Sequence, residues 1–194
     1  MEDKLTQVLV AIDAANSEDP NREVDENGAE HPVALLYGLR MTAELDRLFG
    51  EDVPDVLKIA CRGQHVERWI LKRSDYPEGR AGYLAWRRDQ GRAHGERLAG
   101  FMADAGYSTE ECDRVGVLLR KEGLRRDTEV QMLEDTICMV FLKWYFADFA
   151  QKHPTDKVVN IVAKTSRKMS QSARHRVLEE FDLPEDLALA VKAA

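Results

Sequence analysis

Apolar residues recur at intervals of three and four along most of the chain, the spacing that places them on one face of an α-helix. At the start of the chain, Leu5, Val8, Leu9 and Ile12 follow this pattern. These four residues predict a helix, which the turn-forming residues at 18–21 end. The chain therefore begins with an amphipathic helix.

Proline, glycine and capping residues divide the rest of the chain into further predicted helices. These helices cover residues 32–50, 54–71, 80–105, 108–123 and 127–153, and shorter ones begin near Thr155 and at Leu183-Pro184. Ser108 and Glu111 have the spacing of a capping box. No segment combines apolar alternation with β-branched enrichment, the pattern of a strand. The sequence predicts an all-α fold.

The helix predicted to start at Asp127 or Thr128 is apolar nearly all round between Ile137 and Phe149. A helix of this kind is usually surrounded by other helices. We therefore expect it to be the long central helix of a single-domain helical bundle.

The composition is that of a globular protein. The chain has 194 residues, of which 44% are hydrophobic and 32% charged, enough for one substantial core. No apolar run reaches the roughly 20 residues that span a bilayer, and residues 1–4 lack the pattern of a secretory signal. Three cysteines without paired spacing argue against a disulfide framework. We expect one domain over residues 1–194, in the cytoplasm and away from membranes.

The net charge of −7 is unevenly distributed. Residues 17–30 hold six acids and one base, with Asn, Gly and Pro between them, which is typical of a solvated loop over a neighbouring site. The C-terminal helices, 152–194, are basic at their start, because residues 152–176 hold seven bases and one acid. This stretch would suit nucleic acid or an acidic protein. A pI near 5.3 makes nucleic acid the less favoured partner.

Three predicted helices carry polar side chains on faces that should be buried. Helical spacing places His65 and Arg68 on the buried face of one helix and His94 on that of the next. Glu134 aligns with the buried face of the central helix, and Asp135 lies about 100° round from it. These three segments therefore form the candidate site.

A buried carboxylate without a partner is costly, so Glu134 or Asp135 should be paired or bound to metal. One hypothesis is that His65, His94 and Asp135, or Glu134 in its place, gather round a divalent cation. Imidazole and carboxylate ligands suit Zn, Mn, Fe or Mg. The alternative is that arginines pair with the carboxylates, while both histidines are hydrogen-bonded core residues.

Basic and aromatic residues accompany the candidate site. The guanidinium fork of arginine suits phosphate or carboxylate, and aromatic rings can form stacking walls. The predicted members of an anion pocket are Arg68, Arg87, Arg120, Lys121 and Arg126, with Trp69, Tyr83 or Trp86 as stacking walls. The alternative for most of them is a solvated charge or a packing aromatic.

Six strings spread along the chain carry a resemblance to a known family. They are His65-Val66-Glu67-Arg68-Trp69, Tyr76-Pro77-x-x-Arg80-x-Gly82-Tyr83-Leu84-x-Trp86-Arg87, Leu118-Leu119-Arg120-Lys121, Glu129-Val130-Gln131-x-Leu133-Glu134-Asp135, Tyr145-Phe146-Ala147-Asp148-Phe149-Ala150 and Lys164-Thr165-x-Arg167-Lys168-Met169-Ser170. These strings resemble the uncharacterised domain-of-unknown-function 4202 family. The likeness covers nearly the whole chain, and the family implies no activity.

The order of polar residues is more distantly similar to the HD superfamily of metal-dependent phosphohydrolases, which is also all-helical. Tyr37 stands where the first His of that order would be, and His65-Val66 replaces the His-Asp pair. His94 matches a following His, and Asp135 matches the last Asp. The resemblance implies an HD-like fold and hydrolysis of a phosphorylated small molecule or nucleotide.

Three functions from different classes are therefore open. The first is an HD-like hydrolase, in which a metal held by His65, His94 and Asp135 activates water and Glu134 handles a proton. The second is an HD-like module that binds an anionic ligand without catalysis. The third is a protein- or tRNA-binding adaptor that uses residues 152–176. The sequence leaves the substrate, the metal and the oligomeric state open.

Overall fold

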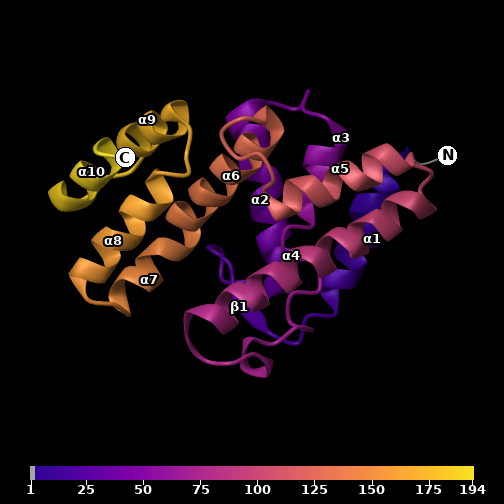
Figure 1. Ribbon diagram of the computed structural model, residues 1–194, viewed down its shortest axis with the longest axis horizontal. Coiled ribbons are helices and arrows are strands. Elements are labelled where there is room, and N and C mark those ends of the chain that lie inside the picture. Colours follow the sequence, from indigo (N-terminus) through magenta and orange to yellow (C-terminus); the bar gives the residue numbers. More distant parts are fainter. Residues whose placement is uncertain (1–2) are drawn as a thin grey trace. The chain divides into compact units, whose positions relative to one another are not determined.

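Helices dominate residues 3–194, which are the residues that the computed structural model describes (Figure 1). The prediction of an all-α fold is confirmed, with one small addition. Two strands, β1 (Arg22–Val24) and β2 (Glu30–Pro32), form an antiparallel hairpin with Glu23 opposite His31. In the described chain, no helix has the length and apolar character that crossing a bilayer requires.

The chain divides into two compact units, one ending at Glu122 and the other beginning at Gly123. The single-domain organisation remains a prediction. The first unit contains the hairpin and the elements α1 (Lys4–Ser17), α2 (Val33–Phe49), α3 (Asp55–Arg62), η1 (Arg73–Asp75), α4 (Gly79–Asp104) and α5 (Thr109–Arg120).

Short helix α3 is central to the first unit, because it contacts α1, α2 and α5, while α4 packs along α5 (Figure 1). Its residues Leu57, Ile59 and Ala60 are completely buried. Leu98 of α4 and Leu118 of α5 are buried to the same degree. The burial of such side chains, roughly 1.5–3 kcal/mol each, stabilises this arrangement.

Side-chain caps begin two of the helices in this unit, α1 and α5. Asp3 caps α1 by accepting the N–H of Thr6 at 2.9 Å. The predicted capping box is present at the start of α5, where the Ser108 hydroxyl accepts the N–H of Glu111 and the Glu111 carboxylate accepts the N–H of Ser108. The predicted helices at 32–50, 80–105 and 108–123 are found within a few residues of their expected bounds.

The prediction that the third helix reaches Leu71 is wrong. Helix α3 ends at Arg62, and residues 63–69 form a series of turns. Glu67 has a positive φ of 50°, which an α-helix does not allow. Buried amide side chains from α1 and α4 hydrogen-bond to the backbone of this segment, which favours the turns over a continued helix.

The sequence predicts a solvated loop for the acidic stretch 17–30, but the structure shows part of a hairpin there. The middle of this stretch forms β1 and the turn of the hairpin. Arg40 of α2 reaches this turn and pairs with Glu23 at 2.5 Å and Glu26 at 3.1 Å. Asp25 pairs with His31 across the hairpin at 3.0 Å. Ion pairs thus hold a segment that its composition alone describes as loose.

The second unit consists of α6 (Thr128–Val140), η2 (Phe141–Tyr145), α7 (Phe146–Gln151), α8 (Thr155–Ser166), α9 (Gln171–Glu180) and α10 (Glu185–Lys192). Helix α8 packs against α10, and α9 contacts both α6 and α10. The long helix predicted at 127–153 is present as α6, η2 and α7 in succession, with a π-helical stretch at η2.

The expected burial of residues 137–149 on all sides is wrong beyond Leu142. No residue of α7 is buried. The aromatic rings of this stretch contact one another instead, since Phe141 lies with its ring centroid 5.9 Å from those of Phe146 and Phe149. Aromatic rings thus pack against one another along this stretch.

Gly82 and Gly100 provide a matched test of how closely α4 of the first unit packs against its neighbours. A Cβ at Gly82 would lie 1.8 Å from the carbonyl oxygen of Pro77, whereas one at Gly100 would meet nothing within 4 Å. We expect Gly82→Ala to lower the free energy of unfolding by about 1–3 kcal/mol through overpacking. Gly100→Ala should leave it unchanged or raise it by up to about 1 kcal/mol. Urea denaturation of both variants checks this, and equal effects would contradict the described turn at Pro77.

Candidate anion-binding site

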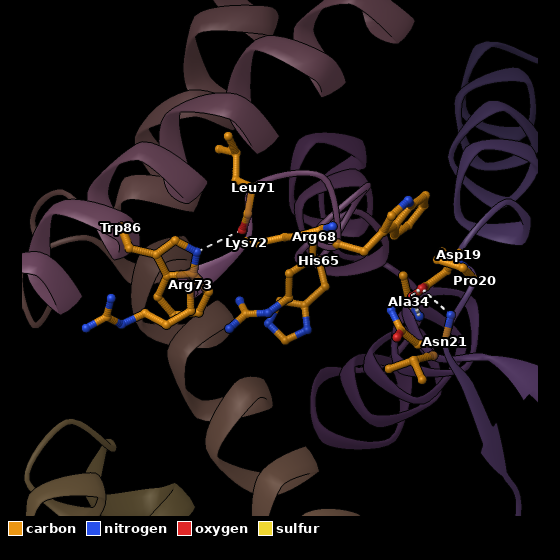
Figure 2. A pocket seen from close by; sticks show the side chains of 12 residues that line it. Asp19, Pro20, Asn21, Ala34, His65, Arg68, Leu71, Lys72, Arg73 and Trp86 are labelled. Atoms are coloured by element: carbon orange, nitrogen blue, oxygen red, sulfur yellow. Dashed lines mark hydrogen bonds between the residues drawn. The ribbon is translucent and has the colours of Figure 1, made fainter. Parts of the chain in front are cut away.

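A cavity of about 650 Å³ lies in the first unit, within the roughly 300–1,000 Å³ typical of small-molecule sites. Its wall combines the segment 65–73, the start of α2 and the base of the hairpin (Figure 2). In this view, His65 and Arg68 lie between Arg73 and Trp86 on one side and Asp19 and Ala34 on the other.

The turn segment that carries His65 and Arg68 is fastened on one side by α1. The side-chain oxygen of Asn16 accepts the backbone N–H of Glu67 at 3.1 Å. Asn16 is only 1% exposed, so this bond is formed away from water. It stabilises the positive φ of Glu67, a conformation that is costly for a residue other than glycine.

Helix α4 fastens the same segment on the other side. The side-chain amide of Gln90, which is 3% exposed, donates to the carbonyl oxygens of Arg68 at 2.9 Å and Leu71 at 3.0 Å. The indole N–H of Trp86 donates to the same Leu71 oxygen at 2.9 Å, as Figure 2 shows. Two helices thus define the backbone path from which Arg68 reaches the cavity.

The guanidinium of Arg68 is the most unusual group in the site. It lies 4.9 Å from the ring centroid of Trp86, in a cation–π contact. No carboxylate of residues 3–194 forms an ion pair with it, although the side chain is half-buried. Burial, together with the charge of Arg87, lowers the pKa of Arg68. A partly desolvated cation without a counter-ion favours the approach of an anion.

His65 lines the cavity next to Arg68. Its ring stacks on Tyr37 of α2 with a centroid distance of 3.8 Å and an interplanar angle of 19°. Burial, followed by the charge of Arg68, lowers the pKa of His65 well below its usual value. The imidazole is therefore neutral at neutral pH and has one N–H donor and one acceptor.

His94 is near His65, with the two ring centroids 6.4 Å apart. It belongs to α4, is 5% exposed and borders a second cavity of about 180 Å³. Burial and the charge of Arg68 lower the pKa of His94 to about 4, while a hydrogen bond to the backbone of Gln64 opposes the shift. Its Nε2 has no hydrogen-bond partner among the described residues. The two imidazoles thus lie close together, although only His94 belongs to a helix.

Of the other predicted pocket residues in the first unit, some line the cavity and others lie outside its lining. Trp69 lines the cavity. Arg87 is exposed, and its charge acts on both histidines; the charge of Lys121 also contributes to the lowered pKa of His65. Tyr83 is 45% exposed and contacts Trp86 outside the cavity lining. Arg120 pairs with Glu122 at 2.6 Å.

Glu134 and Asp135 belong to the second unit, where each contacts nearby groups of that unit. Asp135 accepts the N–H of Ser170 at 2.8 Å and an amide N–H of Gln131 at 2.9 Å. Burial raises the pKa of Asp135, although these hydrogen bonds oppose the shift. Glu134 lies 3.6 Å from the ammonium group of Lys168. Both carboxylates therefore contact the segment that leads into α9.

Within either unit, no three described His, Cys, Asp or Glu side chains are grouped so as to hold a metal ion. Metal ligation by His65, His94 and Asp135 remains a prediction. Arg126 is an exposed residue of the second unit, as are Lys164, Arg167 and Lys168 of the predicted adaptor surface.

The sequence analysis missed part of the cavity lining. Lys72 and Arg73 follow the predicted end of the third helix at Leu71, so helical spacing assigned them to no face. The Arg73 guanidinium donates to the carbonyl oxygens of Tyr76 and Pro77 at 3.0 Å and so stabilises the turn before α4. Only contacts made by the folded chain reveal these roles.

We expect His94 to weaken the fold on acidification. Its pKa is about 4 in the folded chain and near 6.5 in the unfolded chain, so the unfolded state binds the proton first as the pH falls. The free energy of unfolding should therefore decline as the pH falls from 6.5 towards 4, with no contribution from His94 above that window. His94→Gln should make the decline shallower. Urea denaturation across the window measures both slopes, and parallel slopes would contradict the assignment.

Comparison with known proteins identifies one family. The family model described as a domain of unknown function, DUF4202, matches residues 6–191. No curated protein and no solved structure matches the chain. The functional argument therefore depends on the cavity and its side chains.

Proposed function

We propose that this chain, which belongs to the DUF4202 family, binds a phosphorylated small molecule in the cavity of its first unit. The observation that supports the proposal is the Arg68 guanidinium. It is half-buried beside the cavity, and no carboxylate of the described chain forms an ion pair with it. Its planar fork matches two oxygens of a phosphate group. A bound phosphate would supply the missing counter-charge.

The surroundings of Arg68 favour an anion over a cation. Lys72 and Arg73 also line the cavity and add positive charge. The lining holds one acid, Asp19, against these three cations, and its oxygens accept N–H groups of Asn21 and Ala34. His65, being neutral, can donate one hydrogen bond to a phosphate oxygen without a cost in charge.

Replacing Arg68 by Met keeps an unbranched apolar stem against Trp86 and removes the charge. We expect Arg68→Met to bind phenyl phosphate about 10–100-fold more weakly, because a hydrogen-bonded charge contributes about 1.5–3 kcal/mol. Arg92→Met is the matched control, since Arg92 is exposed on α4 and lies outside the cavity lining. Isothermal titration calorimetry with a chelator present measures the affinities. Unchanged affinity in Arg68→Met, with its thermal unfolding midpoint intact, would refute the proposal.

The second candidate function is a metal-dependent phosphohydrolase. The observation that favours it is the proximity of two neutral imidazoles, with 6.4 Å between the ring centroids of His65 and His94. Neutral imidazole is the form that ligates divalent metals. A bound metal would activate water for attack on the phosphate ester. Asp135 as the third ligand and Glu134 as the proton carrier belong to this candidate as predictions.

Metal analysis and a phosphatase screen with Mn, Fe, Zn and Mg test the second candidate. If it is correct, protein purified without chelator should hold a divalent metal and release phosphate from phenyl phosphate. His65→Ala and Asp135→Ala should weaken metal binding by more than the roughly 10–100-fold typical of losing an outer-shell partner. His175→Ala, at an exposed position of α9, is the control. Binding of phenyl phosphate with neither metal nor hydrolysis would leave the binding function alone.

A further inference from the structure

The basic groups of the cavity are gathered in one part of its wall, where Trp69, Leu71 and Trp86 also line it. Its cationic side chains, Arg68, Lys72 and Arg73, all come from the six residues 68–73. The base of the hairpin and the start of α2 contribute Pro20, Val33 and Ala34. Figure 2 shows Pro20 and Ala34 on the side of the cavity away from Arg73.

Hydrogen bonds within the hairpin base use most of its polar groups. One oxygen of Asp19 accepts both the backbone and side-chain N–H groups of Asn21, at 2.9 and 2.8 Å. The other accepts the N–H of Ala34 at 3.0 Å, and the N–H of Val33 donates to the carbonyl oxygen of Asn21 at 3.1 Å. This part of the wall therefore presents mainly apolar surface to a ligand.

The apolar wall is also held in place. Arg40 is 7% exposed and pairs with Glu23 and Glu26 of the hairpin. Ala34 lies in the first turn of α2 and is fastened to Asp19 through its own N–H. A volume of about 650 Å³ exceeds the needs of a phosphate group alone and suits a ligand with a substantial body.

We infer that the ligand is a phosphate monoester with an apolar, aryl or alkyl body, and that the base of the hairpin selects this body. The phosphate binds Arg68 and Lys72, while the body contacts Pro20, Val33 and Ala34. This inference rests on the proposed function and adds the chemistry of the rest of the ligand. A body rich in hydroxyl groups would lose hydrogen bonds to water and find few replacements on this wall.

A series of three probes tests the inference without any change to the protein. Phenyl phosphate, glycerol 3-phosphate and inorganic phosphate share the phosphate and differ in the body. We expect phenyl phosphate to bind at least about tenfold more tightly than the other two, because only its ring buries apolar surface against the hairpin base. Titration calorimetry with a chelator present gives the three affinities.

A variant of the wall locates the selectivity. Ala34→Leu fills the space beside the hairpin base and should weaken phenyl phosphate about tenfold, while inorganic phosphate binds as before. Ala43→Leu, at an exposed position of the same helix, is the matched control. Val33→Thr, which changes polarity with little change in shape, should reduce the preference for phenyl phosphate if Ala34→Leu does not fold.

The outcomes separate the two proposals. Equal affinity for all three probes, lost in Arg68→Met, would overturn the apolar body and leave phosphate binding intact. Tighter binding of glycerol 3-phosphate would overturn it in the same way. No Arg68-dependent binding of any probe would overturn the proposed function itself, and the inference with it.

Discussion

The departure of residues 63–71 from helical geometry is the constraint on which the candidate site depends. Two buried amides, Asn16 and Gln90, bond to the backbone of this segment from opposite sides. Backbone groups that leave a helix need such partners when they are buried. Because these partners come from α1 and α4, the packing of the first unit determines where Arg68 enters the cavity.

Local charge and overall charge have opposite signs in this protein. The chain carries a net charge of −7, yet basic groups predominate at the cavity, where burial and then the charge of Arg68 lower the pKa values of His65 and His94. Two acids of the hairpin, Glu23 and Glu26, pair with Arg40, which leaves Asp19 as the acid of the cavity lining. An anion at Arg68 would therefore meet a positive local field.

The sequence predicts best those elements that local interactions determine. The capping box at Ser108 and the turns that bound α4 and α5 depend on residues a few positions apart, and the structure confirms them. The end of α3 at Arg62 could not be predicted in the same way, because hydrogen bonds from Asn16 and Gln90 decide it. The hairpin escaped notice because its strands have three residues each.

The candidate site shows the same division between local and tertiary causes. The interruption of an apolar pattern by polar side chains drew attention to His65, Arg68 and His94, and the first unit brings the two histidine rings within 6.4 Å. Lys72 was nevertheless missed, because the predicted helix ended at Leu71. Hydrophobic spacing identifies polar residues near a core, but the folded backbone decides which of them share a cavity.

A crystal structure of the chain with phenyl phosphate would locate the bound ligand. We expect phosphate oxygens at hydrogen-bond distance from the Arg68 guanidinium, with the phenyl ring directed towards Ala34. Phenyl phosphate bound elsewhere, or a cavity without ligand at a saturating concentration, would contradict this expectation.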